Sequence, residues 1–193
     1  MPRNAKQPTT IYEIKVSLYG SKPAIWRSIQ VSADITLYKL HKIIQEVMGW
    51  EDMHLHQFVI GNDRYKVRDP HADLEMDESG KNERTHRLRQ VVPEVGFQFC
   101  YEYDFGDGWK HTLAVERVFA PEEDVKYPRC TAGARACPPE DVGGIHGYSE
   151  FLEALRDPNH PAHQEMTDWI GRTFDPEVFD LVMTNQIIRQ LFP

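Results

Sequence analysis

Two carboxylates and an imidazole lie close together in the stretch YEYDFGDGWKH, residues 101–111. Asp104, Asp107 and His111 could bind a divalent metal ion or transfer protons, since carboxylates and imidazoles do both. A structural alternative is also open and is favoured. In this alternative, Asp104 accepts hydrogen bonds from backbone N–H groups across a turn, and Asp107-Gly108 is an ordinary turn dipeptide. Trp109 would then pack beneath a sheet.

Two cysteines and several histidines suggest a second kind of metal chemistry. Six residues separate Cys130 from Cys137, whereas paired cysteines of zinc sites are usually two to four residues apart. A glycine-containing loop could still bring both thiols to one zinc ion. Histidine would have to complete that site, from the set His54, His56, His111 and His146. The alternative is two buried or half-exposed thiols, and a disulfide is disfavoured in a reducing cytosol.

The segment PPEDVGG, residues 138–144, places Glu140 and Asp141 beside two consecutive glycines. A Gly-Gly turn allows a ligand or another stretch of backbone to come close. The favoured alternative is a rigid Pro-Pro lead-in to a turn or helix. No phosphate-binding GxxxxGK[ST] or GxGxxG pattern is present. The pair His54 and His56 would share one face of a strand, where structural histidines are the favoured interpretation.

The elements that must position these residues begin with two strands and a helix. Residues 11–18 and 24–31 alternate in hydrophobicity, which predicts a hairpin of two strands. Residues 37–48 carry apolar side chains at helical spacing, with Thr36 as N-cap and Gly49 as the C-terminal stop. A third strand is predicted over 54–60. The order ββαβ indicates an α+β fold with a β-grasp-like, mixed or antiparallel sheet.

The second part of the chain is predicted to contain another hairpin, a long loop and helices. Residues 61–90 are polar and are interpreted as a solvated loop, with a partly helical form as an open alternative and with Tyr65 and Val67 extending the third strand into a hairpin. Strands at 96–105 and 111–119 flank the 104–111 bend. Residues 120–148 are rich in proline and glycine and are interpreted as a long ordered loop, a type that is often functional. Three C-terminal helices, the last with Asp175 as N-cap and Pro176 at its first position, should cover one face of the sheet.

Composition narrows the functional classes. The 193 residues carry a formal net charge of −8, which disfavours binding of nucleic acid without excluding a local basic patch. The short polar N-terminus and the small, odd number of cysteines predict a cytoplasmic protein. No apolar stretch is long enough for a membrane span. We expect a disordered tail over residues 1–10 and a single domain over 11–193.

Four stretches together resemble the plasmid pRiA open-reading-frame-3-like domain family. They are TLYKLHKIIQEVMGWEDMHLHQF, YDFGDGWKHTLAVE, YPRCTAGARACPPEDVGGIHGYSEFL and FDPEVFDLVMTN. The resemblance covers residues 10–190 and implies an α+β fold in a family of bacteria and archaea, partly encoded on plasmids or beside mobile elements. It implies no catalytic roles, because no serine-recombinase signature can be mapped here. His146 stands where the family pattern often has tryptophan or another bulky residue.

Three functional hypotheses follow. The leading one is a non-enzymatic binding or accessory module with a protein partner, whose recognition surface contains Asp104, Asp107, Trp109, His111, Glu140 and Asp141. The second is a metal-dependent hydrolase or nuclease that uses the 104–111 bend together with residues 130–146. Its metal would be a divalent ion such as zinc, held by Cys130, Cys137, His111 and His146. The third is a DNA-associated factor of a mobile element.

Overall fold

The computed structural model describes residues 10–67 and 80–192 and contains one mixed sheet and five helices. The tail predicted over residues 1–10 therefore lies, apart from Thr10, outside the described residues. In chain order the elements are β1 Ile11–Leu18, β2 Trp26–Ser32, α1 Leu37–Met48, β3 His56–Ile60, β4 Asp63–Lys66, β5 Lys81–Asn82, α2 Leu88–Val91, β6 Gln98–Tyr103, β7 Trp109–Phe119, β8 Arg129–Ala134, α3 Gly144–Arg156, α4 His163–Ile170 and α5 Leu181–Leu191.

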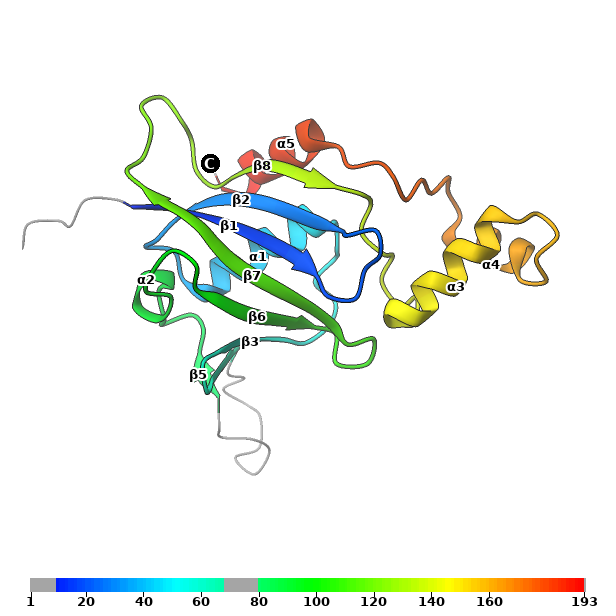
Figure 1. Cartoon of the computed structure of the whole chain (residues 1–193), viewed down its shortest axis with the longest axis horizontal. Helices are drawn as coiled ribbons and strands as arrows, with labels where there is room; N and C mark the ends of the chain where they lie inside the picture. Colours follow the sequence, from blue (N-terminus) through cyan, green and yellow to red (C-terminus); the bar gives the residue numbers. More distant parts are fainter. Residues whose placement is uncertain (1–9, 68–79, 193) are drawn as a thin grey trace, which may run out of the picture.

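The eight strands form a sheet in the order β5-β4-β3-β6-β7-β1-β2-β8 (Figure 1). Neighbouring strands are antiparallel except for β4 and β5, which are parallel. The central strand β1 pairs Ile14 with Ile29 of β2 on one side and with Val115 of β7 on the other. This arrangement confirms the predicted α+β class.

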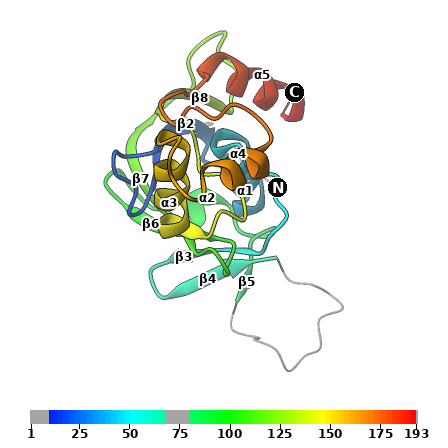
Figure 2. The ribbon, with the colours of Figure 1, turned by 90° about the vertical axis from the view of Figure 1, so that its right-hand side faces the viewer.

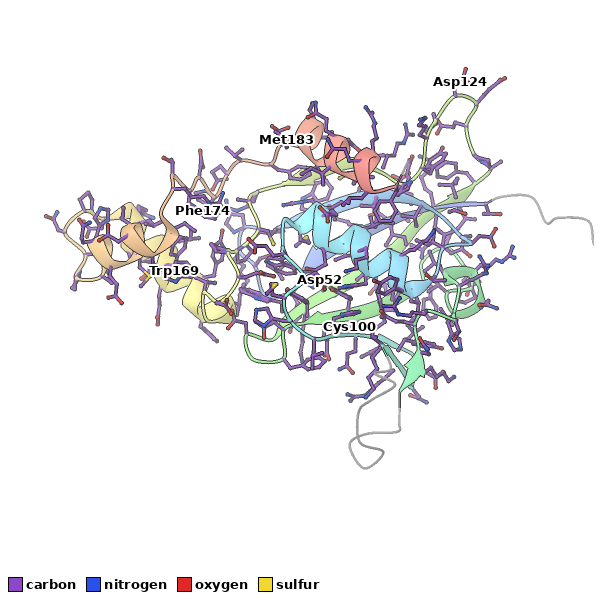
Figure 3. All side chains as sticks on the ribbon, turned by 180° about the vertical axis from the view of Figure 1, so that it is seen from behind. Asp52, Cys100, Asp124, Trp169, Phe174 and Met183 are labelled. Carbon is purple, nitrogen blue, oxygen red and sulfur yellow. The ribbon has the colours of Figure 1, made fainter. Side chains whose placement is uncertain are left out.

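The spacing of hydrophobic residues along the sequence explains why the central strands and α1 form where they do. Along β1, the buried Ile14, Val16 and Leu18 alternate with partly exposed residues, as the sequence predicts. Helix α1 packs an apolar face against the sheet and lies across it (Figure 3). The hydroxyl of Thr36 accepts a hydrogen bond from the N–H of Lys39, and Gly49 adopts φ 86°, so both predicted ends of this helix are confirmed.

Three segments differ from their predictions. The polar stretch 61–90 contains β4, β5 and the start of α2, of which a helical part was an open alternative, and the pairing of β4 with β3 confirms the predicted hairpin. Residues 68–79 of this prediction lie outside the described residues. The long loop contains an edge strand, β8, whose sequence RCTAGA has no period-two pattern and which is ordered by pairing with β2. The last helix begins at Leu181, because Asp180 caps it by accepting from the N–H of Met183. Asp175 instead accepts from the N–H of Glu177 in a turn.

The C-terminal helices do not all cover the sheet as predicted. Helix α5 packs against the edge strand β8 and touches α1. Helices α3 and α4 pack on each other beyond the end of the sheet. The bend between the end of β6 and the start of β7 therefore lies next to the start of α3 (Figures 1 and 2). No helix among the described residues has the length and apolarity needed to cross a lipid bilayer.

Candidate functional site

The 104–111 bend is organised by the side chain of Asp104. This residue follows β6 and adopts φ 54°, a left-handed conformation that aspartate tolerates better than most residues. Its Oδ1 accepts hydrogen bonds from the N–H groups of Gly106 (2.9 Å) and Asp107 (3.3 Å). This is the structural role predicted for Asp104, but it occupies only one of the two carboxylate oxygens.

The Pro/Gly segment 138–144 folds over this bend. The N–H of Gly143 donates to Asp107 Oδ2 at 3.1 Å. A Cβ atom added to Gly144 would lie 2.4 Å from the carbonyl oxygen of Asp107, so the two backbones touch where only glycine fits. The segment leads directly into α3, as the favoured interpretation has it, and the close backbone approach that was the alternative is also present at Gly144.

Glu140 and Trp50 fix the same segment to the rest of the molecule. Glu140 Oε1 accepts from the hydroxyl of Tyr103 and from the N–H of Glu51 (3.2 Å). The indole N–H of Trp50 donates to the carbonyl of Pro138 at 3.0 Å. Burial raises the pKa of Tyr103, and its hydrogen bond to Glu140 acts in the same direction. Tyr103 thus remains a neutral donor to the carboxylate.

One histidine joins the two acidic segments. His54 Nε2 lies 3.2 Å from Asp141 Oδ1 and 3.7 Å from Asp104 Oδ2. One ligand atom from each of these three residues lies within 4.8 Å of the others. We call His54, Asp104 and Asp141 the open group, because the side chain of Asp141 is 73% exposed. An imidazole and two carboxylates suit Mn²⁺, Mg²⁺ or Zn²⁺.

Exposed apolar side chains flank the open group in the sequence. Met53 and Leu55 stand on either side of His54 and are more than 70% exposed, and Phe105, next to Asp104, is 55% exposed. The N–H of Asp104 donates to the carbonyl of Leu55 at 2.9 Å, so these two stretches lie side by side. We call Met53, Leu55 and Phe105 the apolar rim.

A second set of ligand-type side chains lies deeper in the molecule. His41 of α1, Asp52 and His56 of β3 also bring one ligand atom each within 4.8 Å of one another. His41 Nε2 is 3.0 Å from Asp52 Oδ1, and both oxygens of Glu83 lie within 3.1 Å of His56 Nε2. We call His41, Asp52, His56 and Glu83 the buried group, since the side chain of Glu83 is fully buried and that of His41 almost so.

The surroundings keep His41 neutral and oriented. Burial and the neighbouring His56 together lower the pKa of His41 to about 3, while Asp52 acts in the opposite direction. The Nδ1 atom of His41 lies 2.8 Å from the hydroxyl oxygen of Tyr101, and this oxygen accepts a hydrogen bond from the amide of Gln45 at 2.8 Å.

His111 and Trp109, both predicted for the functional surface, are core residues of β7. His111 is fully buried between the rings of Trp50 and Tyr101, and neither of its ring nitrogens has a hydrogen-bond partner among the described residues. Burial lowers its pKa to about 3. Trp109 is also buried and stacks near Trp50.

The residues predicted as zinc ligands are not brought together. Among residues 10–67 and 80–192, neither group of potential ligands includes Cys130, Cys137, His111 or His146. The cysteines are free thiols. Burial raises the pKa of Cys130 to about 11 and also raises that of Cys137, so both remain protonated at neutral pH. His146 lies exposed near the start of α3.

The sequence analysis missed the residues that complete both groups. His54 and His56 were considered as further ligands of the cysteine site, with a structural role favoured, and His41, Asp52 and Glu83 were not singled out. One available signal was the motif HLH, in which both histidines share a strand face close to an acidic turn. Nothing in the local sequence pointed to Glu83, because its partner His56 is a contact of the tertiary structure.

Comparisons with known proteins agree with this fold. Residues 10–183 match the family model described as "Plasmid pRiA4b ORF-3-like protein". The chain is 35% identical over 187 residues to "Uncharacterized protein y4hQ" of Sinorhizobium fredii, a match that covers 94% of this chain and 92% of the relative. It also resembles the crystal structure of MM3350 from Methanosarcina mazei Go1, titled a protein of unknown function. That likeness has a TM-score of 0.82 at 38% identity and covers 91% and 97% of the two chains.

Proposed function

We propose that this chain, which belongs to the plasmid pRiA4b ORF-3-like protein family, is a binding module that uses a divalent cation at the open group. The observation that carries the proposal is the convergence of His54, Asp104 and Asp141 within 4.8 Å from three separate segments. One imidazole and two carboxylates supply both the charge and the donor atoms that a divalent ion requires.

The open group leaves room for a further ligand on the ion. Asp104 supplies only Oδ2, because Oδ1 is engaged in the turn. With Asp141 largely exposed, solvent reaches the outer side of the site. Three protein ligands leave at least one position of a four- to six-coordinate ion for water or for a donor atom of a partner.

The apolar rim favours a protein segment as the partner. Apolar side chains exposed together with a few polar anchors are typical of interaction surfaces. Met53, Leu55 and Phe105 could pack against apolar side chains of such a segment while one of its carboxylates coordinates the ion. The net charge of −8 supports this choice over nucleic acid, because phosphate recognition normally requires basic side chains.

A metal-dependent hydrolase or nuclease is the second candidate, and the same open position supports it. A divalent ion with a free coordination site can bind water, lower its pKa and present it as a nucleophile. Turnover of a phosphodiester or ester by the Mn²⁺- or Zn²⁺-loaded chain would favour this candidate over the binding module.

The decisive experiment measures Mn²⁺ binding by metal-stripped protein, using calorimetry together with water proton relaxation. We expect bound Mn²⁺ to retain exchangeable water and therefore to enhance relaxation. Asp141→Asn should weaken Mn²⁺ binding at this site by at least about ten-fold. Asp104→Asn should do the same, since asparagine keeps an Oδ1 acceptor for the turn and tolerates φ above zero.

Asp124→Asn is the matched control. Asp124 is also an exposed aspartate with positive φ, but it lies at the tip of the loop after β7, away from the open group (Figure 3). This variant should bind Mn²⁺ as the wild-type protein does. If all three variants bind with the same affinity, or if bound Mn²⁺ produces no relaxation enhancement, the proposal is wrong.

The β-grasp-like character of the sheet also remains a proposal. It is supported by the order β1, β2, α1, β3 and by the packing of α1 across one face of the sheet. Such sheets often act through partner binding, although a fold by itself does not establish a function.

A further inference from the structure

We infer that the buried group is a second cation site, distinct from the open group, and that it takes a transition-metal ion such as Zn²⁺ or Fe²⁺. Two imidazoles and a carboxylate are the donors that such ions prefer over Mg²⁺ or Ca²⁺. The donors would come from His41, Asp52 and His56. Glu83 would either hydrogen-bond to His56 or coordinate the ion itself. The two groups share no residue.

The first support is geometric. His41 Nε2 and Asp52 Oδ1 are 3.0 Å apart, and the rings of His41 and His56 are parallel within 3° with centroids 3.4 Å apart. Two ligands of one tetrahedral zinc ion, each about 2.0–2.1 Å from it, are themselves separated by about 3.3 Å. One ion can therefore contact His41 and Asp52 with little movement, whereas His56 must rotate out of the stack to direct a ring nitrogen at it.

The second support is the position of a carboxylate beside each imidazole. Asp52 lies 3.0 Å from His41 Nε2, and Glu83 lies 3.0 Å from His56 Nε2. The two rings are stacked in parallel planes, so coordination of one ion by both requires one ring to rotate out of the stack.

The third support is buried negative charge. Glu83 is 0% exposed, and the ion-pair partner that the structure gives its carboxylate is His56. Asp52 pairs with Lys42, so one ammonium stands against the two carboxylates of the group. Burying a carboxylate is costly unless a charge or several hydrogen bonds compensate it. A divalent ion at His41, Asp52 and His56 would provide that charge.

The fourth support is the set of outer contacts that orient His41. When Nε2 of a histidine binds a metal, its Nδ1–H usually donates to a neighbouring oxygen. The hydroxyl oxygen of Tyr101, 2.8 Å from His41 Nδ1, can accept that bond, while the amide of Gln45 holds the same hydroxyl in place. Gln45 also accepts from the N–H of Asp52 at 3.1 Å, so one glutamine links two of the ligands.

The experiment uses Co²⁺ as a spectroscopic probe of the full chain after removal of all metal. We expect visible absorption bands of four- or five-coordinate Co²⁺, and competition of Zn²⁺ for the same site. Asp52→Asn should weaken this Co²⁺ binding by more than about 100-fold, since it removes a ligand rather than an outer contact. Asparagine retains the positive φ of 57° that Asp52 adopts.

Two further variants separate this site from the open group and from loss of folding. Asp141→Asn should leave the Co²⁺ bands unchanged, and Asp52→Asn should leave Mn²⁺ binding at the open group unchanged. His56→Gln, tested in parallel with circular dichroism as a check on folding, should also abolish the bands. The inference is overturned if folded wild-type protein gives no such bands, or if the bands persist in both Asp52→Asn and His56→Gln.

Discussion

The two oxygens of Asp104 have different roles, and this division connects the bend to the proposed function. Oδ1 closes the turn, whereas Oδ2 faces His54. Each role alone would account for an aspartate here, which is why the structural and the functional interpretations of the sequence are compatible. Asparagine preserves the first role and loses the charge of the second, so Asp104→Asn separates them.

His111 predicts a measurable dependence of stability on pH. The unfolded chain should titrate this imidazole near its ordinary pKa of 6.5, whereas burial lowers the pKa to about 3 in the folded protein. Between these values the unfolded state binds more protons. The contribution to the free energy of unfolding is therefore complete above pH 6.5 and is lost as pH falls, by up to about 1.4 kcal/mol per pH unit.

His111→Phe should reduce this loss. Phenylalanine fills a similar volume between Trp50 and Tyr101 and brings no buried nitrogens that lack partners. Urea unfolding at pH 7.5 and at pH 5 should show that the variant loses less stability than the wild type over this interval. His41 titrates in the same direction but is present in both proteins. Equal losses in the two proteins would contradict the prediction.

At the scale of elements, the contact between the bend and the segment 138–144 depends on Gly144. Its φ is 69°, and a Cβ atom would lie 2.4 Å from the backbone oxygen of Asp107, which cannot rotate away. Gly144→Ala should therefore separate the two segments, with a cost of about 1–3 kcal/mol in the free energy of unfolding. It should also weaken Mn²⁺ binding at the open group, because Asp141 belongs to the displaced segment.

Gly61→Ala is the control for Gly144→Ala. Gly61 has a similar φ of 60°, but nothing lies within 4 Å of an added Cβ. This variant should cost only about 1–2 kcal/mol for the left-handed backbone and should leave Mn²⁺ binding unchanged. If both variants alter Mn²⁺ affinity equally, the bend does not depend on the close contact at Gly144.

At the scale of the whole molecule, Arg27 connects parts that are distant in the sequence. It is 2% exposed, and its guanidinium donates to four carbonyl oxygens, those of Trp26, Val47, Ala134 and Arg135, at 2.7–2.9 Å. The ring of Phe179 lies over it at 3.9 Å. One side chain thereby joins β2, the end of α1, the end of β8 and the segment before α5.

Arg27→Met should destabilise the molecule by at least about 3 kcal/mol, because the carbonyl groups lose charged donors in a buried place. Arg27→Lys should recover little of this loss, since an ammonium cannot reproduce the planar fork of five N–H groups. Thermal and urea unfolding would measure both effects. Arg117→Met is the control: Arg117 is an exposed arginine on β7 near Phe119, and its loss should cost less than about 1 kcal/mol.

The parts of the fold that the sequence predicted are those with strong local signals. Two such signals are the alternation of apolar residues in β1 and the helical spacing in α1, with Thr36 and Gly49 at the ends of the helix. Both depend on neighbouring residues, so both elements can be predicted without the tertiary structure. β8 and the start of α5 were predicted incorrectly. The strand RCTAGA is ordered by its pairing with β2, and the chain before α5 forms a turn at Asp175 and then passes Gly133, where Phe179 packs.

The sequence by itself determined the bend at Asp104, the turn that leads into α3 and the acidic character of this region, because turns and short-range sterics depend on local chemistry. Only the tertiary structure decided which side chains meet. The pairing of β3 with β6 sets His56 opposite Tyr103, the strand end next to Asp104, and the folding of 138–144 over the bend brings Asp141 to His54. Such contacts depend on strand register and on packing between segments far apart in the chain, and no local pattern encodes them.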